Sequence, residues 1–240
     1  MASIDFQILK AHFLALRDHA YEPGQSSYLQ YLGGLNEACQ LSGDPLEGNL
    51  FYSSPPDFLE TLTLMPETRF RDKRRDYANY VFSGTSMLEI GFNGGHSALL
   101  ALSVNPNLKY VGVDFGNHPY TRSCFDYLKD IFGARIDLLI GDSRELVPAI
   151  RHMRQMSFDL FHIDGGHDFG VAYTDMCNVI DMCKDGDVIL FDDTNSGVAV
   201  WQLDEICDFF IMKGIVSRVQ CSRLWQSDNH VLLRVNKGTR

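Results

Sequence analysis

Several common signatures are missing from this 240-residue sequence. None of its six cysteines forms a Cys-x-x-Cys pair, so the sequence does not favour a zinc ribbon or a thioredoxin-type redox site. It has no run of about 18 consecutive apolar residues, so we expect no segment that spans a membrane. Basic residues are also scarce. Lysine and arginine number 21 against 31 acidic residues, and the formal net charge of −10 argues against a surface that binds nucleic acid.

The first 20 residues do not resemble a secretory signal, because charged side chains interrupt their amphipathic pattern throughout. Without such a signal, the cysteines are expected to be reduced thiols in a protein core, as in a cytoplasmic enzyme. The sequence leaves the oligomeric state open, and a homo-oligomer is one of the alternatives.

From residue 86 onward, short apolar segments alternate with segments of helical periodicity. This alternation predicts an α/β domain over residues 83–240, with a Rossmann-like, mostly parallel sheet and helices on both faces. A short connection separates the last two strands, which is compatible with antiparallel pairing. The predicted strands are residues 86–91, 109–114, 136–140, 158–164, 187–192, 215–221 and 230–235, and the predicted helices are residues 96–104, 120–132, 143–155, 170–183 and 196–211.

Residues 1–82 have a different pattern and are expected to form a helical extension, or a lid over a binding site. The aromatic residues Phe51 and Tyr52 stand in a stretch rich in Gly, Pro, Ser and Asn, and we expect them to be exposed. The charged stretch Arg69–Asp76 is expected to be a solvated helix face. The expected elements are a helix over residues 4–20, loops and short helices over residues 33–66, and a charged helix over residues 66–82.

A glycine-rich turn follows the first predicted strand. In the segment Met87–Ser97, Gly91 ends the strand and Gly95 stands at the start of a helix. Glycines allow a ligand to approach the backbone closely, and a helix N-terminus favours negatively charged groups. In an open α/β sheet such a turn lies at the carboxyl end of the strand, where ligands bind. The pattern differs from the dinucleotide motif Gly-x-Gly-x-x-Gly.

Acidic residues stand at the ends of successive predicted strands. Asp114 ends the second strand, and its carboxylate can accept hydrogen bonds from both hydroxyls of a ribose. Asp142 ends the third strand and can accept one from an adenine amino group. Glu89 lies inside the apolar first strand, where its carboxylate needs a partner. Helix caps and turns explain any one of these residues equally well, but they explain the ordered series less readily.

Together these residues resemble the cofactor site of class I methyltransferases that use S-adenosylmethionine. The motifs are Glu-Ile-Gly-x-x-x-Gly-x-Ser, then Val-Asp, then Gly-Asp-Ser, and the resemblance covers residues 86–237. It implies a seven-stranded sheet whose final strand is antiparallel, with S-adenosylmethionine as the methyl donor. By matching position, the implied cofactor contacts are Glu89, Gly91, Gly95, Ser97, Asp114, Asp142 and Ser143.

A second group of carboxylates follows the fourth and fifth predicted strands. Asp164 stands in Ile-Asp-Gly-Gly-His, and Asp192 and Asp193 stand in Phe-Asp-Asp. If these strands are neighbours, the three carboxylates converge and repel one another unless a cation is present. Oxygen ligands suit a hard ion such as Mg²⁺, Mn²⁺ or Ca²⁺. A helix-capping role for Asp193 is the alternative.

A metal at this position would lower the pKa of a bound hydroxyl and so favour methyl transfer to its oxygen. His167 follows Asp164 closely and is the candidate general base for the released proton. Asp164 is the second catalytic candidate.

The Ile-Asp-Gly-Gly-His and Phe-Asp-Asp motifs narrow the resemblance. They are similar to those of the metal-dependent O-methyltransferases of the macrocin and mycinamicin sugar-methylating type, and more distantly to the catechol O-methyltransferase group. This resemblance implies a divalent cation, Mg²⁺ or Mn²⁺, on Asp164, Asp192 and Asp193, with His167 as the base. The implied partner is a hydroxylated small molecule, such as a sugar or a vicinal diol.

Three alternatives stay open. A metal-independent N- or O-methyltransferase would use His167 or Asp164 directly. A nicotinamide-dependent oxidoreductase is disfavoured, because the dinucleotide motif and a Tyr-x-x-x-Lys pair are both missing. A non-catalytic binding module would keep the pocket, although the intact acidic positions argue against it. Of two further histidines, His162 is expected in the core, and His96 either in the core or beside the pocket.

Overall fold

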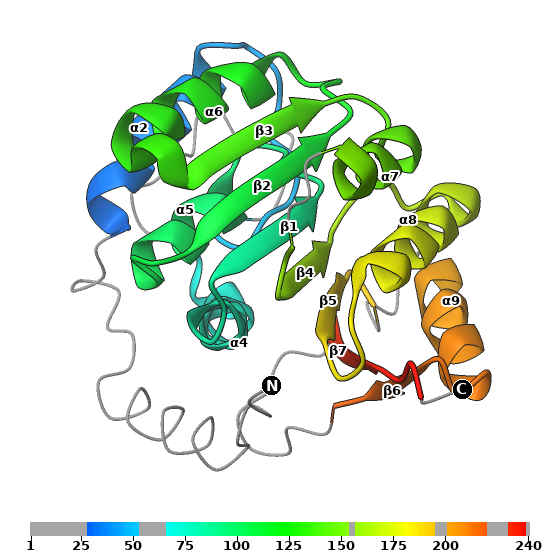
Figure 1. The fold of residues 1–240 in the computed structure, drawn as a ribbon. Helices are drawn as coiled ribbons and strands as arrows, with labels where there is room; N and C mark the ends of the chain where they lie inside the picture. Colours follow the sequence, from blue (N-terminus) through cyan, green and yellow to red (C-terminus); the bar gives the residue numbers. More distant parts are fainter. Residues whose placement is uncertain (1–27, 53–65, 154–156, 195–200, 220–229, 239–240) are drawn as a thin grey trace.

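The protein was analysed as a computed structural model, which describes residues 28–52, 66–153, 157–194, 201–219 and 230–238. The helix expected over residues 4–20 lies outside the described residues. The described part is an α/β fold around one central sheet (Figure 1).

The central sheet has seven strands in the order β3-β2-β1-β4-β5-β7-β6. The first five strands in the chain run parallel, whereas β7 is antiparallel to both β5 and β6. The predicted seven-stranded, mostly parallel sheet with an antiparallel final strand is therefore confirmed. The strands are β1 (Ser86–Ile90), β2 (Lys109–Asp114), β3 (Ile136–Ile140), β4 (Leu160–Ile163), β5 (Val188–Asp192), β6 (Val216–Arg218) and β7 (His230–Val235).

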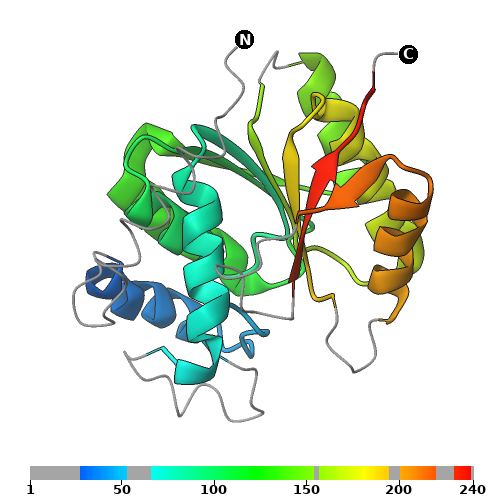
Figure 2. The same ribbon diagram turned by 90° about the horizontal axis from the view of Figure 1, so that it is seen from below.

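Helices cover both faces of the sheet, as predicted, and each face has its own apolar core. Figure 2 shows α2, α4, α5 and α6 on one side of the strands and α7, α8 and α9 on the other. None of the described helices combines the length and the hydropathy that crossing a bilayer requires. The helices are α2 (Leu29–Gln40), α4 (Arg71–Phe82), α5 (His96–Val104), α6 (Pro119–Phe132), α7 (Ser143–Met153), α8 (Phe169–Met182) and α9 (Trp201–Met212), with short 3-10 turns at Thr68–Phe70 and Gly133–Arg135.

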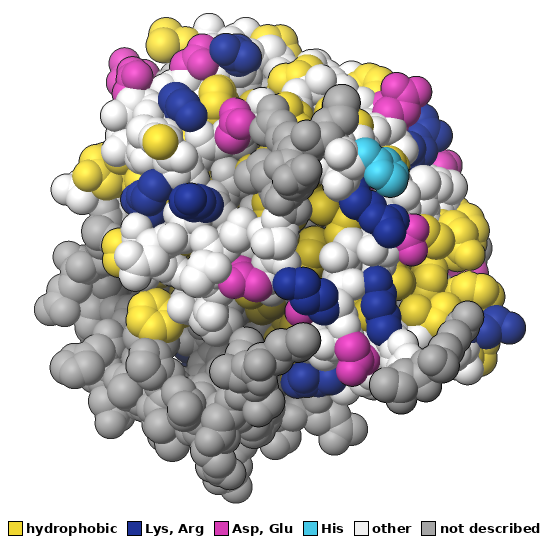
Figure 3. Space-filling view, in the orientation of Figure 1, with side chains coloured by type: hydrophobic (Ala, Val, Ile, Leu, Met, Phe, Trp, Pro, Cys, Tyr) yellow, Lys and Arg dark blue, Asp and Glu magenta, His cyan; other side chains and the backbone are white. Residues whose placement is uncertain are grey.

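The surface carries charges of both signs. On the face shown in Figure 3, lysines and arginines lie among acidic and uncharged side chains, and hydrophobic side chains gather over α8 and α9. In that apolar region the ring of Tyr173 stacks on Phe169 and on Phe210, with centroid distances of 5.9 and 5.5 Å. The described residues of this face form no continuous basic stripe of the kind that phosphate backbones require.

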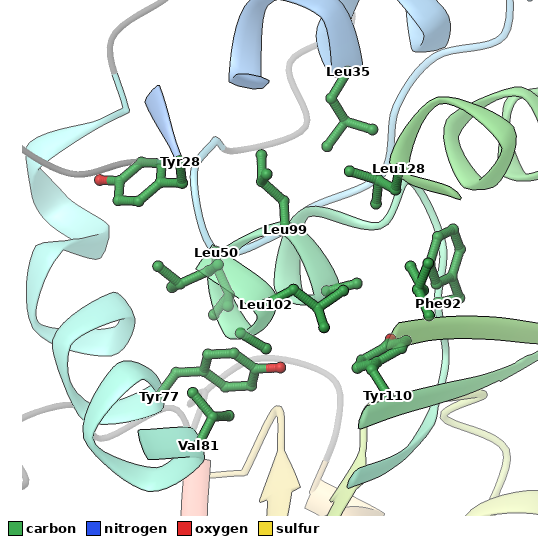
Figure 4. Packing of buried hydrophobic residues seen from close by; sticks show 14 of the residues in the cluster. Tyr28, Leu35, Leu50, Tyr77, Val81, Phe92, Leu99, Leu102, Tyr110 and Leu128 are labelled. Atoms are coloured by element: carbon green, nitrogen blue, oxygen red, sulfur yellow. The ribbon is translucent and has the colours of Figure 1, made fainter. Parts of the chain in front are cut away.

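Residues 28–52 contribute side chains to the apolar core. Residues 29–40 form the helix α2, where loops and short helices were expected from residue 33 onward. The predicted exposure of Phe51 and Tyr52 is wrong, because their side chains are 0% and 3% exposed. Phe51 packs edge-on against Tyr28, with ring centroids 5.3 Å apart. Figure 4 shows Tyr28, Leu35 and Leu50 in the same apolar cluster as residues of α4, α5, α6 and the sheet.

The charged helix α4 is also buried on one side. Arg74 and Asp76 are 1% and 0% exposed, so the predicted solvated face is wrong for these residues, whereas Arg69 and Arg71 are exposed. The guanidinium of Arg74 donates to the carbonyl oxygens of Leu50 and Glu67, at 2.9 and 3.0 Å. Burial of this charge is tolerated because these hydrogen bonds replace water. Arg74 thereby ties α4 to the N-terminal segment.

The cysteines agree with the prediction of core thiols. Of the described cysteines, all of which are free, Cys39, Cys124, Cys183 and Cys207 are buried and Cys177 is partly buried. Cys221 lies outside the described residues.

Candidate active site

The glycine turn after β1 lies at the carboxyl end of the parallel strands. Gly91 has φ of +99°, and a Cβ atom there would lie 1.9 Å from the carbonyl oxygen of Asp164. Only glycine fits this position, because β1 and β4 approach so closely at their ends. Gly95 has φ of +72° and immediately precedes α5. The two glycines therefore shape the turn and place the start of α5 beside it.

Asp114 links the turn to the next strand. Its carboxylate accepts the backbone N–H groups of Asn93 and Gly116, each at 2.7 Å. Asn93 has φ of +51°, and its side-chain oxygen accepts the hydroxyl of Tyr120 at 2.6 Å. Each carboxylate oxygen has a second lone pair to offer. The partly exposed Asp114 thus keeps the capacity to accept ribose hydroxyls, as the sequence predicts.

Glu89 and Ser97 lie beneath the turn, and their direct contact with a cofactor stays a prediction. Glu89 is 0% exposed and Ser97 is 8% exposed. One oxygen of Glu89 accepts hydrogen bonds from the hydroxyls of Ser97 and Tyr110, and the other lies 2.6 Å from Nδ1 of His162. Both carboxylate oxygens of Glu89 therefore have partners inside the protein. Glu89 and Ser97 therefore position the turn rather than line its surface.

Asp142 and Ser143 stand where β3 passes into α7. The guanidinium of Arg144 holds the carboxylate of Asp142 with two nitrogens, and the backbone N–H of Arg144 also donates to it. These hydrogen bonds lower the pKa of Asp142. Ser143 is the first residue of α7. Both residues lie at the carboxyl edge of the sheet, and their contact with adenine stays a prediction.

His162 connects the two groups of carboxylates inside the sheet. It is 0% exposed, as expected for a core histidine, and its Nε2 lies 3.7 Å from Oδ2 of Asp192. Burial lowers its pKa, but the charges of Glu89 and Asp192 outweigh burial and raise the pKa to about 10. His162 is therefore a buried cation between two acidic side chains.

Asp192 is itself held from two directions. Nζ of Lys73, on α4, lies 2.7 Å from its Oδ1, and the backbone N–H of Asp193 donates to the same oxygen at 2.8 Å. Burial opposes ionisation of Asp192 and is the largest single effect, but Lys73, His162 and His230 together outweigh it and hold the pKa of Asp192 well below its usual range. Nζ of Lys73 also lies 3.9 Å from Oδ1 of Asp193.

These contacts decide how the three predicted metal ligands fit a divalent cation. Asp192 faces an ammonium, and Asp193 is directed to His167 as well as to Lys73. Among the described residues, the group of three or more histidine, cysteine or acidic side chains whose ligand atoms all lie within 4.8 Å of one another is Glu89, His162 and Asp164. The set Asp164, Asp192 and Asp193 does not form such a group. The donor set therefore does not fit a metal, because Lys73 already supplies positive charge to it.

Asp164 lies directly after β4, next to Gly91. Its backbone N–H donates to the carbonyl oxygen of Ile90 at 2.8 Å. Burial and the nearby charge of Asp192 raise the pKa of its carboxyl well above the usual range.

His167 forms the exposed part of the site. Its side chain is 47% exposed, and its Nε2 lies 3.0 Å from Oδ2 of Asp193. The hydrogen bond with Asp193 raises the pKa of His167 above 6.5, against a smaller opposing effect of burial. Asp193 has φ of +55°, a backbone conformation that is uncommon for residues other than glycine. A small pocket at the carboxyl ends of β4 and β5 brings together Asp164, His167 and Asp192, but not Asp193. It is lined by Ile163, Asp164, Gly165, Gly166, His167, Ala172, Phe191, Asp192 and Leu203.

Two functional candidates escaped the sequence analysis. Lys73 belongs to the stretch expected to be solvated, and Tyr110 was counted only as part of an apolar strand. The spacing of Lys73, Tyr77 and Tyr80 places all three on one helix face. Two aromatic residues on one helix face indicate that this face is buried. That signal could have identified Lys73 as a buried residue.

Comparison with known proteins shows what this part of the chain is similar to. Residues 88–194 match the family model described as a methyltransferase domain. This match spans the glycine turn, Asp114 and all three carboxylates of the second group. A search of curated protein sequences found no match.

Solved structures agree with the class I fold of S-adenosylmethionine-dependent methyltransferases. An O-methyltransferase from Bacillus cereus in complex with S-adenosylhomocysteine superposes with a TM-score of 0.61 at 16% identity, covering 94% of this chain and 97% of that one. The O-methyltransferase TomG from Streptomyces achromogenes gives 0.58 at 15% identity, covering 86% and 90%. CalS11, a TDP-rhamnose 3′-O-methyltransferase of calicheamicin biosynthesis, gives 0.55 at 16% identity, covering 91% and 98%. At these identities the likeness shows the fold alone.

Proposed function

We propose that this methyltransferase transfers a methyl group from S-adenosylmethionine to a hydroxyl oxygen of a small molecule, with His167 as the general base and without a divalent cation. The observation that carries the proposal is the exposed His167, paired with Asp193 at 3.0 Å beside the carboxyl end of β4. This is the metal-independent methyltransferase among the alternatives that the sequence leaves open. The fit of Lys73 among the carboxylates supports that choice.

The cofactor is assigned to the turn after β1 and to Asp114. Gly91 and Gly95 have no side chains that would keep a ligand from the backbone at the carboxyl edge of the sheet. Asp114 has lone pairs that can accept hydrogen bonds from ribose hydroxyls. Asp142 is assigned to the adenine side by its place at the end of β3. When bound, S-adenosylmethionine supplies an electrophilic methyl carbon on a positively charged sulfur.

His167 is assigned the proton of the acceptor hydroxyl. In the neutral imidazole, Nε2–H donates to Asp193 and Nδ1 keeps a free lone pair. Asp193 thus holds the ring in one tautomer, as an orienting carboxylate does in other acid–base pairs. When an acceptor hydroxyl is methylated, its proton would pass to Nδ1 of His167. Bound S-adenosylmethionine would supply the methyl carbon, and its sulfur would keep the electron pair of the broken carbon–sulfur bond as a neutral thioether.

An oxygen acceptor is consistent with the histidine base of this site and with the names of structurally similar proteins. A neutral hydroxyl is a weak nucleophile and gains from a base, which this site offers. Three of the structurally similar proteins are O-methyltransferases by name, and one acts on TDP-rhamnose. We extend this to a hydroxylated small molecule, with a sugar as the first class to test.

The N-terminal segment is proposed to shape the acceptor side of the site. Asn36 on α2 accepts from Nε2 of His96, directly after the glycine turn, at 3.1 Å. Asp44 lies 2.9 Å from Nδ1 of His118, in the loop that follows Asp114. These contacts place residues 28–52 against the turns that bind ligands in this fold.

The test is a turnover assay of the full chain with S-adenosylmethionine and a panel of nucleotide sugars, glycosides and catechols, run in excess EDTA. We expect release of S-adenosylhomocysteine with at least one hydroxylated acceptor, and a methyl group on oxygen by mass spectrometry and NMR. Turnover restricted to amine acceptors, or turnover that EDTA abolishes, would contradict the proposal.

A further inference from the structure

Lys73 lies on the face of α4 that packs against the sheet. Tyr80, seven positions later, uses its hydroxyl to bond the carbonyl oxygens of Phe161 on β4 and Val188 on β5, both at 2.8 Å. The ring of Tyr77, on the same face, lies 5.2 Å from the ring of His162. These contacts fix α4 over the two strands that carry the second group of carboxylates. The position of Lys73 is therefore determined by the fold and not by a flexible loop.

The ammonium of Lys73 reaches the carboxylates at the ends of these strands. Nζ lies 2.7 Å from Oδ1 of Asp192 and 3.9 Å from Oδ1 of Asp193. The side chain of Lys73 is 10% exposed and that of Asp192 is 2% exposed. This is a buried ion pair, unlike the exposed pairs at the surface of the protein.

The unfavourable free energies of burying the ammonium and of placing two carboxylates side by side offset each other here. A buried ammonium is costly unless it has a charged partner, and adjacent carboxylates repel one another unless a cation lies between them. A lysine ammonium is a compact point charge, so it can occupy the place of a small cation among carboxylate oxygens.

We infer that Lys73 is the resident cation of the Asp192–Asp193 pair, and that its ammonium replaces the divalent ion that this pattern of carboxylates suggests in the sequence. The inference rests on the proposed function, because it takes the carboxylates to be part of the acceptor site. It assigns to Lys73 the task of supplying fixed positive charge beside the acceptor oxygen.

The ammonium can also do part of the chemistry of a metal. It carries three N–H donors, while its described partners are the carboxylates of Asp192 and Asp193. A remaining donor can bind an acceptor hydroxyl, and a positive charge there favours loss of the hydroxyl proton to His167. A single charge polarises the oxygen less than a divalent ion does.

The experiment measures Mn²⁺ binding by electron paramagnetic resonance and calorimetry in the full chain saturated with S-adenosylhomocysteine. We expect no stoichiometric Mn²⁺ site in the parent or in the charge-preserving Lys73→Arg control. In Lys73→Ala the carboxylates lose their cation, and we expect one Mn²⁺ to bind at least about tenfold more tightly than in the parent. The added substitution Asp192→Asn should abolish that site. Turnover of Lys73→Ala should fall and then recover in part with Mn²⁺, which a purely structural ion pair would not produce.

Two results would overturn the inference. One is a parent that binds one Mn²⁺ and loses it in Asp192→Asn. The other is a folded Lys73→Ala chain that binds no more Mn²⁺ than the parent. Should Lys73→Ala not fold, Lys73→Met keeps the apolar stem, and the parent titration decides without any variant. The proposed function fails separately, through absent binding of S-adenosylhomocysteine or absent turnover in the parent.

Discussion

His167 and Asp193 set the pH dependence of the reaction. The hydrogen bond that His167 donates to the carboxylate of Asp193 raises the pKa of His167, so the rate should rise with pH along a limb centred above pH 6.5. In His167→Gln we expect turnover to fall by about 10²–10⁴-fold and this limb to vanish, with affinity for S-adenosylhomocysteine unchanged. In Asp193→Asn the limb should move to lower pH, because the charge that raises the pKa is gone. The measurement is kcat/KM against pH. An unaltered profile in His167→Gln would remove His167 from the mechanism.

His96 offers a pH test of folding that is separate from catalysis. Burial lowers its pKa from 6.5 to about 3, and the side chain is 2% exposed. Between these values the unfolded chain binds a proton that the folded chain excludes, so this group stabilises the fold above pH 6.5 and loses that contribution as the pH falls. From pH 7 to pH 5 the parent should lose about 2 kcal/mol more unfolding free energy than His96→Gln. Urea unfolding of both chains measures this, and equal losses would show that His96 is not buried as described.

Single residues also show where sequence reasoning stops. The sequence predicts that Glu89 needs a partner, and the structure supplies three of them in Ser97, Tyr110 and His162. The sequence could not identify these partners, because side-chain contacts across strands depend on the register of the strands. For the same reason the carboxylates of Asp192 and Asp193 predict a cation, but not that Lys73 provides it from a distant helix.

At the scale of elements, α4 is held to the sheet mainly through Tyr80. Its hydroxyl bonds the backbone of both β4 and β5, whereas the hydroxyl of Tyr77 lies 3.9 Å from the sulfur of Met87, a weak acceptor. Both tyrosines are buried on one helix face. We expect Tyr80→Phe to lower the unfolding free energy by about 1–3 kcal/mol, and Tyr77→Phe by less than about 1 kcal/mol. Urea denaturation of the two variants measures the difference. Equal losses would contradict the anchoring role.

The elements differ in how well they could be predicted. From Ser86 onward every predicted strand and helix is found near its expected bounds, because each has a clear apolar period and a turn at its end. The helix α2 contains Gly33 and Gly34, which favour loops in isolation. Its packing overrides that preference, since Leu32 and Leu35 are fully buried. Tertiary contacts of this kind are not visible in local sequence patterns.

At the scale of the whole molecule, the sheet order places the two predicted groups side by side. Because β1 lies between β2 and β4, the glycine turn is adjacent both to Asp114 and to Asp164. Alternation of strands and helices predicts such an edge in general terms. Which side chains can contact a ligand depends on their direction at that edge. Asp114 is partly exposed there, whereas Glu89 is fully buried.

The most direct test of the account is calorimetric titration of the parent chain with S-adenosylhomocysteine, set against NAD. We expect S-adenosylhomocysteine to bind with one molecule per chain and NAD not to bind. Asp114→Asn should weaken binding of S-adenosylhomocysteine by roughly 1.5–3 kcal/mol, as expected for charge-assisted hydrogen bonds, and circular dichroism should confirm that this variant folds. Tight binding of NAD together with no binding of S-adenosylhomocysteine would contradict the account.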